Sequence, residues 1–155
     1  MRMLYLAICA DDVLALEVDP DTAAHLLADG DVVNLGQAWH GLHFLLNGSA
    51  FGGSGPLFDA VLGGVPLGDP TSYEPVRLVT AEQVVAVTAA LPAPAELVPR
   101  FTHRALRQAE VYPDDAWSRE DALTGFLLPA YDVLVAVFAA AAAAGDAVLL
   151  TLDRS

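Results

Sequence analysis

Apolar and polar residues along the chain divide it into segments with the periods of strands and helices. Residues 1–10 are apolar on both alternating faces, which predicts a central strand covered on both sides. Shorter apolar runs predict a short strand at 76–79 and a final strand at 147–152. The other periodic segments have the spacing of helices, and no internal repeat or linker separates them. The pattern therefore predicts a single compact α+β domain over residues 1–155.

Helices are predicted where apolar residues recur every three or four positions between capping residues. One covers 19–29, where Pro and Asp suit a first turn, and another covers 35–46 and stops at an Asn–Gly pair. Thr80 and Gln83 form a capping box at the start of a further helix. One or two short helices are expected between 94 and 108.

The longest predicted helix spans 119–144, with Ser118 as its cap. Pro129 lies inside this segment, and its ring clashes with the carbonyl of Gly125, so we expect a kink there. The apolar run 133–145 holds thirteen residues. A bilayer span needs about 20 residues, so no membrane association is expected.

The composition favours a folded cytoplasmic protein. Apolar residues make up 55% of the 155 residues, which is enough for a substantial core. Cys9 is the single cysteine, so no internal disulfide can form. The apolar stretch at the N-terminus is short and is followed at once by two Asp residues, which is unlike a signal peptide.

Charge is the strongest compositional signal. Twenty acidic residues face seven basic ones, for a net charge of −13, and all seven basic residues are arginine. Such a chain is repelled by nucleic acids and anionic lipids and is attracted to basic proteins. The absence of lysine excludes pyridoxal-dependent enzymes, P-loop NTPases and protein kinases.

Trp39, His40 and His43 are candidate site residues on the predicted 35–46 helix. Helical spacing turns His43 into the apolar face, where a neutral ring bonded to a backbone carbonyl is expected, and leaves His40 at the edge of that face. A polar binding site against Trp39 is the alternative. A catalytic zinc needs three protein ligands, and no HExxH motif or Cys pair supplies them, so neither a metal nor a cofactor is predicted. Folding could bring His25 or His103 near, but the sequence does not show it.

Residues 48–75 form a long segment rich in Gly and Pro, and such loops often carry function. Tyr73, Glu74 and Arg77 stand at its exit as candidates for the polar rim of a binding site. Arg77 can clamp a carboxylate or phosphate, or it can form a structural ion pair with Glu74.

Several blocks resemble the YfbM-like family of bacterial domains of unknown function. The most specific block is Trp39-His40-Gly41-Leu42-His43, and others lie at 56–64, 66–68, 73–78 and 112–113. The resemblance spans almost the whole chain and implies a small cytoplasmic α+β fold. It supplies no catalytic residues. Some relatives occur in toxin–immunity gene neighbourhoods, which implies an inhibitor role.

Two functions follow as hypotheses. The first is an acidic binding protein, in its specific form an immunity-type inhibitor that covers the basic active site of a nucleic-acid-directed toxin. Its charge, its size and the lack of a complete catalytic motif favour it. The second is a small-molecule-binding or hydrolytic domain with a pocket near Trp39, His40, His43 and Arg77.

Overall fold

The sheet at the centre of the molecule is antiparallel throughout. The computed structural model describes residues 1–68 and 75–154, and within them five strands have the order β2-β1-β5-β4-β3. β1 and β5 pair along their whole length, from Arg2 opposite Asp153 to Ile8 opposite Ala147. The strands are β1 (Arg2–Ile8), β2 (Val33–Asn34), β3 (Val65–Pro66), β4 (Arg77–Val79) and β5 (Ala147–Asp153).

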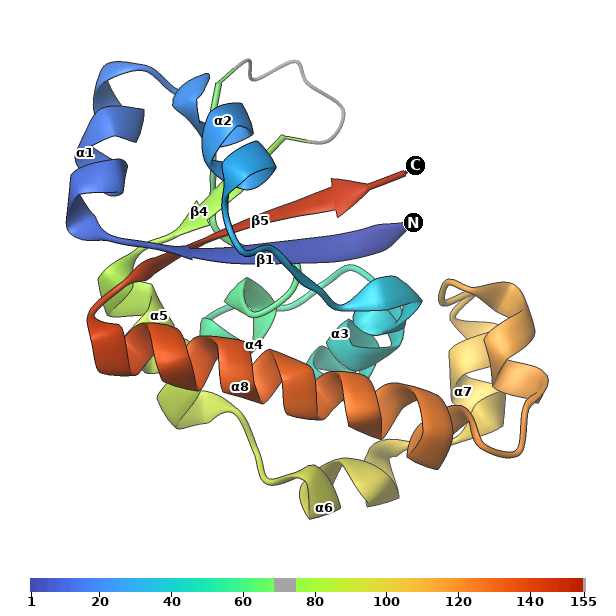
Figure 1. The fold of residues 1–155 in the computed structure, drawn as a ribbon. Helices are drawn as coiled ribbons and strands as arrows, with labels where there is room; N and C mark the ends of the chain where they lie inside the picture. The colour runs from blue at the N-terminus through green and yellow to red at the C-terminus, as the bar shows by residue number, and fades with distance from the viewer. Residues whose placement is uncertain (69–74, 155) are drawn as a thin grey trace.

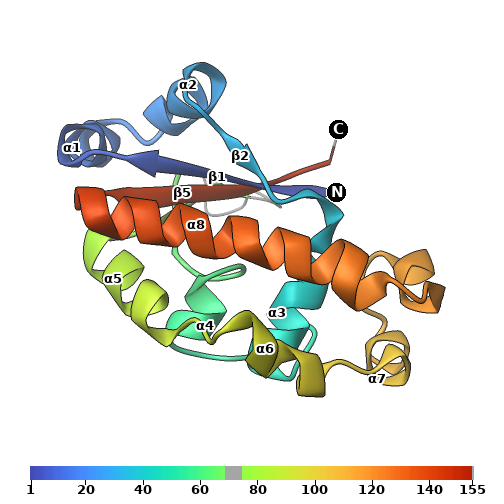
Figure 2. The same ribbon diagram turned by 60° about the horizontal axis from the view of Figure 1, so that its bottom comes forward.

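Helices cover both faces of this sheet (Figures 1 and 2). One face is covered by α1 (Ala10–Val18) and α2 (Thr22–Asp29). The helices on the other side are α3 (Trp39–Asn47), α4 (Pro56–Asp59), α5 (Ala81–Ala90), α6 (Pro94–Leu97), α7 (His103–Gln108) and α8 (Leu128–Ala144). Single 3₁₀ turns lie at Gly36–Ala38, Val98–Arg100 and Asp114–Ser118.

The two layers of helices produce two apolar cores. Met3 and Tyr5 of β1 enter the larger core on the α8 side, whereas Leu6 and Ile8 enter the smaller core with Leu16 of α1. β1 is therefore buried from both sides, as its two apolar faces predict. The predicted α+β domain is confirmed, with β1 in an inner position and β5 at the middle of the sheet.

The long C-terminal helix is confirmed, with a different start. It begins with a π-helical turn at Ala122–Leu127 and continues as α8, in which Pro129 is the second residue. The irregularity expected at Pro129 thus takes the form of a wider turn just before it, which accommodates a residue without an N–H. Ser118 does not cap this helix, because it ends the preceding 3₁₀ turn instead.

This helical stretch is also longer than the apolar run read from the sequence. Ala122–Ala144 comprises 23 residues and is long and apolar enough to cross a membrane, judged by length and composition alone. In the fold, Tyr131, Leu134 and Phe138 are fully buried in the larger core. Core helices of globular proteins share this length and composition, so the expectation drawn from the thirteen-residue run rested on too short a segment.

The capping residues explain where several helices begin and end. Thr80 Oγ1 accepts from the Gln83 N–H, and the Gln83 side chain accepts from the Thr80 N–H, so the predicted capping box is present. Gly48 and Gly145 end α3 and α8 in the left-handed conformation that glycine adopts without strain.

Candidate functional site

His40 is buried and fully hydrogen-bonded. Its Nδ1 accepts the N–H of Tyr112 at 2.8 Å, and its Nε2 lies 2.8 Å from the carbonyl oxygen of Ala50. An acceptor role at Nδ1 places the proton on Nε2, which then donates to Ala50. Only 2% of the residue is exposed, so the expectation that His40 lies at the edge of the apolar face was wrong. The loop after α3, through Ala50, and the segment after α7, through Tyr112, enclose it.

His43 occupies the position predicted for it. The residue has no exposed surface, and its Nε2 lies 2.9 Å from the carbonyl oxygen of Gly52. Asn47, one helical turn later, donates to His43 Nδ1 at 3.3 Å and to the carbonyl of Leu57 at 3.1 Å. Both rings therefore attach the loop after α3 to the helix, and both act as neutral hydrogen-bonding groups.

Burial accounts for the protonation state of both rings. It lowers the pKa of His40 and of His43 below the ordinary value, because a charged imidazolium loses its hydration there. The hydrogen bonds to Ala50 and Gly52 raise the two pKa values, but their effect is smaller than that of burial. The positive charge of Arg77 lowers the pKa of His43 further.

Two aromatic rings pack against His40. Trp39 stacks on it with ring centroids 4.9 Å apart, and Phe51 lies on it at 4.7 Å. Tyr112 stacks on Trp39 at 5.9 Å. Phe51 is 67% exposed, so this cluster reaches the surface.

The guanidinium of Arg77 is hydrogen-bonded to the backbone of the fold. Its two terminal nitrogens donate to the carbonyls of Val61 at 3.1 Å and Gly63 at 2.9 Å. Burial lowers the pKa of its guanidinium, whereas the neighbouring Tyr5 raises it. Among the described residues Arg77 makes no ion pair, and Tyr73 and Glu74, proposed as its neighbours, lie outside those residues.

A cavity of about 650 Å³ nevertheless brings together three of the predicted residues, Trp39, His40 and Arg77. Its other walls include Phe51 and Tyr112, while His43 is sealed behind them. Both ring nitrogens of His40 and the two terminal nitrogens of Arg77 already have partners inside the protein. The cavity combines this occupied polar wall and its aromatic surface with the charged side chains of Glu110, Asp114 and Arg154. In the part of the chain that the structure describes, no three His, Cys, Asp or Glu side chains are grouped to hold a metal ion.

A second feature was not singled out from the sequence, namely an acidic surface formed by α1, α2 and the chain that follows α2 as far as Asp31, here named the acidic face of α1 and α2. Residues 11–31 contain seven acidic residues and none of the seven arginines. Six of these acids are exposed and Asp12 is half-buried. Four arginines lie in or beside α7 and the neighbouring 3₁₀ turns, at the opposite end of the molecule (Figure 1). The count of charges along the sequence could have revealed this asymmetry.

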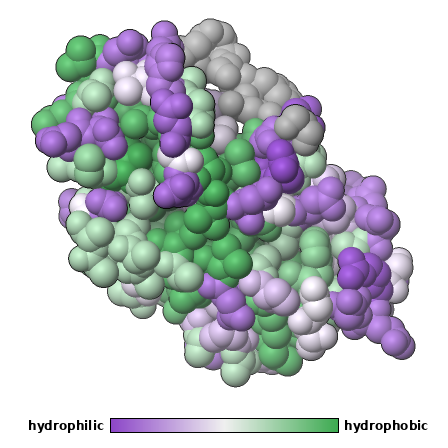
Figure 3. All heavy atoms as spheres, viewed as in Figure 1, coloured by the Kyte–Doolittle hydropathy of each residue, from purple (hydrophilic) through white to green (hydrophobic). Residues whose placement is uncertain are grey.

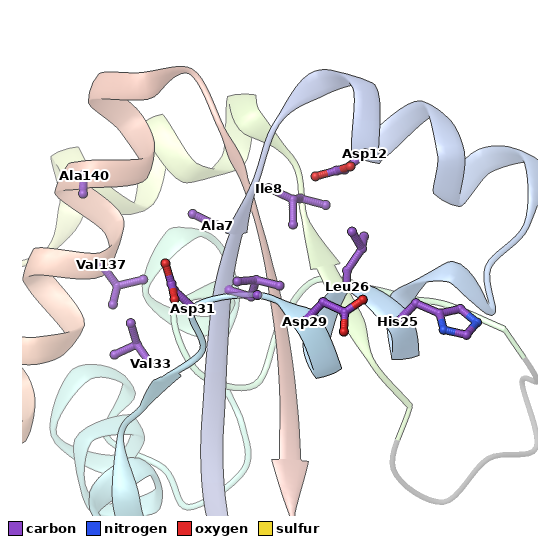
Figure 4. A pocket seen from close by; sticks show the side chains of 12 residues that line it. Ala7, Ile8, Asp12, His25, Leu26, Asp29, Asp31, Val33, Val137 and Ala140 are labelled. Carbon is purple, nitrogen blue, oxygen red and sulfur yellow. The ribbon is translucent and has the colours of Figure 1, made fainter.

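The acidic face borders an apolar groove of about 550 Å³. Leu6, Ala7 and Ile8 of β1 contribute to it, together with Val137 and residues of α2 (Figure 4). Figure 3 shows hydrophobic residues at the surface near the centre of this side, with hydrophilic residues above them where α1 and α2 lie. The groove thus combines apolar walls with carboxylates.

The comparisons with known proteins define a family. The model of a domain of unknown function (DUF1877) matches residues 1–151, so the chain belongs to that family. A solved structure titled as a protein of unknown function, YfbM from Escherichia coli, matches with a TM-score of 0.75 and 20% sequence identity. That match covers 99% of this chain and 100% of the other. None of the curated proteins matches the chain.

These matches confirm the YfbM-like resemblance and the α+β fold. At 20% identity the likeness to YfbM concerns the fold alone. Neither match assigns a reaction, a ligand or a partner, so function rests on the residues of this chain.

Proposed function

We propose that this chain is a non-catalytic binding protein that engages a basic protein through the acidic face of α1 and α2. The observation that carries the proposal is the concentration of seven acids, with no arginine, in residues 11–31. A surface of one sign attracts a partner of the opposite sign over a Debye length, and it speeds their encounter.

The state of the histidines supports a binding role over a catalytic one. A general acid or base needs a nitrogen that can exchange a proton with a substrate. Both nitrogens of His40 are occupied by backbone groups, and burial keeps the ring neutral. A proton transfer at His40 would therefore break contacts that attach two loops to α3.

The finer form of the proposal is an immunity-type inhibitor of a nucleic-acid-directed toxin. The active sites of such toxins are basic because they bind phosphates. An acidic face can cover such a site by occupying the place of the nucleic acid. This form predicts that nucleic acid and this chain compete for one surface of the toxin.

The test uses an oligo-arginine peptide as a basic probe, with binding followed by fluorescence anisotropy at about 0.02 M and 0.3 M salt. One variant converts five acids of the face to amides, and a matched variant converts five acids elsewhere, so both retain the same net charge. The face set is Asp11, Asp12, Glu17, Asp29 and Asp31, and the matched set is Glu82, Glu96, Glu120, Asp132 and Asp146. The face variant is expected to bind at least about tenfold more weakly, and the matched variant about twofold more weakly. Equal losses in the two variants would contradict the proposal.

A second candidate function is the binding of a small molecule in the cavity beside Trp39. The observation that favours it is the volume of about 650 Å³, which lies within the range of ligand pockets. Exposed Phe51 forms one wall, so Phe51→Ala opens the cavity without removing a buried hydrogen bond. A thermal-shift screen of aromatic carboxylates should yield hits that this variant loses, and a screen without hits argues against the site.

A further inference from the structure

The edge strand β2 covers only part of β1. β2 pairs with β1 at two positions, Leu4 opposite Asn34 and Tyr5 opposite Val33. Beyond Tyr5, β1 continues through Leu6, Ala7 and Ile8 with β5 on one side, and no strand within the described residues lies on the other. The apolar groove lies along this uncovered edge, where the chain from α2 crosses to β2 (Figure 4).

The register identifies the backbone groups that point into the groove. The Leu35 N–H donates to the Met3 carbonyl at 2.9 Å, which makes that position a hydrogen-bonded pair. In an antiparallel ladder such pairs recur at every second residue, so Met3, Tyr5 and Ala7 direct their N–H and C=O groups to the β2 side. Among the described residues, those of Ala7 have no hydrogen-bond partner. Ala7 is also exposed.

The walls of the groove carry both apolar surface and carboxylates. Val137 and Ala140 of α8 form one side, and Leu26 of α2 lies on the other (Figure 4). Asp31 stands on the α8 side of β1, while Asp12 and Asp29 stand on the side of α1 and α2 (Figure 4). Carboxylates therefore flank the uncovered strand edge on both sides, and the residues that line the groove include no Arg.

We propose that this groove binds an extended basic segment of a protein partner by strand addition to the free edge of β1. An added strand satisfies the N–H and C=O of Ala7, which is the way exposed sheet edges recruit peptides. Side chains of an added strand alternate between the two walls. Arginine suits both walls, because its methylene groups cover the apolar surface while its guanidinium reaches a carboxylate.

This inference rests on the proposed function and specifies how the basic partner is bound. The acidic face alone would attract any cationic surface, folded or extended. The groove adds a requirement for a free backbone N–H and C=O on the incoming segment. A folded basic surface without an exposed strand lacks these groups and cannot enter.

The experiment uses a short peptide of alternating arginine and valine, with acetylated and amidated ends. Control peptides carry glutamate in place of arginine, or N-methyl groups at alternate backbone nitrogens of the arginine peptide. Affinity is measured by fluorescence anisotropy at low salt, and the exchange of the Ala7 amide is followed by NMR with and without peptide. If the peptide adds as a strand, it should slow the exchange of the Ala7 amide at least about tenfold. The N-methylated peptide should then bind at least about tenfold more weakly than the arginine peptide.

Variants separate the groove from the rest of the acidic face. The groove variant converts Asp12, Asp29 and Asp31 to Asn, and its matched control converts three acids of the same segment outside the groove, Asp11, Glu17 and Asp19, to amides. The groove variant should lose about tenfold in affinity and its control about twofold. Ala7→Pro removes the N–H that faces the groove and spares the ladder to β5, whereas Ala7→Ser retains it. Circular dichroism checks that each variant is folded.

The outcomes distinguish failure of strand addition to β1 from failure of the acidic face as a binding surface. If the arginine peptide binds through the acids while Ala7 exchange and N-methylation have no effect, strand addition is overturned and the acidic face stands. If the glutamate peptide binds equally well, the basic occupant is wrong. If neither the arginine peptide nor oligo-arginine binds the wild-type chain, the proposed function fails together with this inference.

Discussion

The main-chain N–H of Tyr112 donates to Nδ1 of His40 across 72 positions of sequence, at a distance of 2.8 Å. This bond makes Nδ1 an acceptor and leaves the ring proton on Nε2, which is directed to Ala50. His40 thereby joins three segments, namely α3, the loop after it and the segment after α7. This histidine, a candidate site residue in the sequence, forms a structural link in the fold.

Replacement of His40 by Ala should destabilise the protein strongly. The change leaves the Tyr112 N–H and the Ala50 carbonyl without their partner and opens space between Trp39 and Phe51. We expect a loss of about 2–4 kcal/mol in the free energy of unfolding, measured by urea denaturation. The exposed His25 provides the control, since His25→Ala should cost less than about 0.5 kcal/mol. A similar small cost at His40 would contradict the structural role.

The stability should fall as pH decreases below about 6.5. In the unfolded chain the histidines titrate near that pH, whereas burial lowers the pKa of His40 and His43 in the folded chain. Unfolding therefore takes up protons in this range, and the free energy of unfolding decreases as the pH falls from about 7.5 to 5.5. Comparison of the wild type with His43→Gln isolates this contribution from that of the carboxylates. The wild type should show the steeper loss, and parallel curves would count against a buried neutral ring.

Gly41 should not tolerate a side chain. A Cβ there would lie 2.6 Å from the Trp117 ring and 2.7 Å from a methyl group of Leu127, because α3 packs closely against both. Gly41→Ala should cost about 1–3 kcal/mol through overpacking, despite the better helix propensity of Ala. The double variant with Leu127→Ala should be more stable than the sum of the two single changes predicts. Strict additivity in thermal unfolding would show that the two sites do not touch.

The capping box at the start of α5 should contribute measurably to stability. Thr80→Ala removes the oxygen that accepts the Gln83 N–H and should cost about 1 kcal/mol. Thr80→Ser retains that oxygen and should cost much less. If the two variants unfold at the same urea concentration, the cap contributes nothing.

The elements predicted from the sequence are those with strong local signals. The Thr80 capping box, the Asn–Gly end of α3 and the doubly apolar β1 depend on neighbouring residues, and the structure contains all three. α1 was missed because its apolar residues do not follow a helical period, and the two-residue strands β2 and β3 are too short for any pattern. Their positions depend on tertiary pairing.

The candidate site could be predicted from the sequence only in part, for a related reason. Burial of His43 follows from helical spacing, whereas burial of His40 depends on Tyr112 and Ala50, which the fold brings from other segments. Arg77 was predicted to face a ligand or Glu74, and it serves backbone carbonyls that no pattern identifies. The free edge of β1 depends on where β2 ends, which requires the structure.

We propose that the acidic face of α1 and α2 binds the partner and that the histidine cluster does not. The most direct measurement compares the affinity for oligo-arginine of the face variant, with its five acids converted to amides, and of a folded His40→Gln variant, at one low salt concentration. Binding by the acidic face requires a loss of at least about tenfold in affinity for the face variant and of less than about twofold for His40→Gln. A large loss for His40→Gln with an unchanged face variant would contradict it.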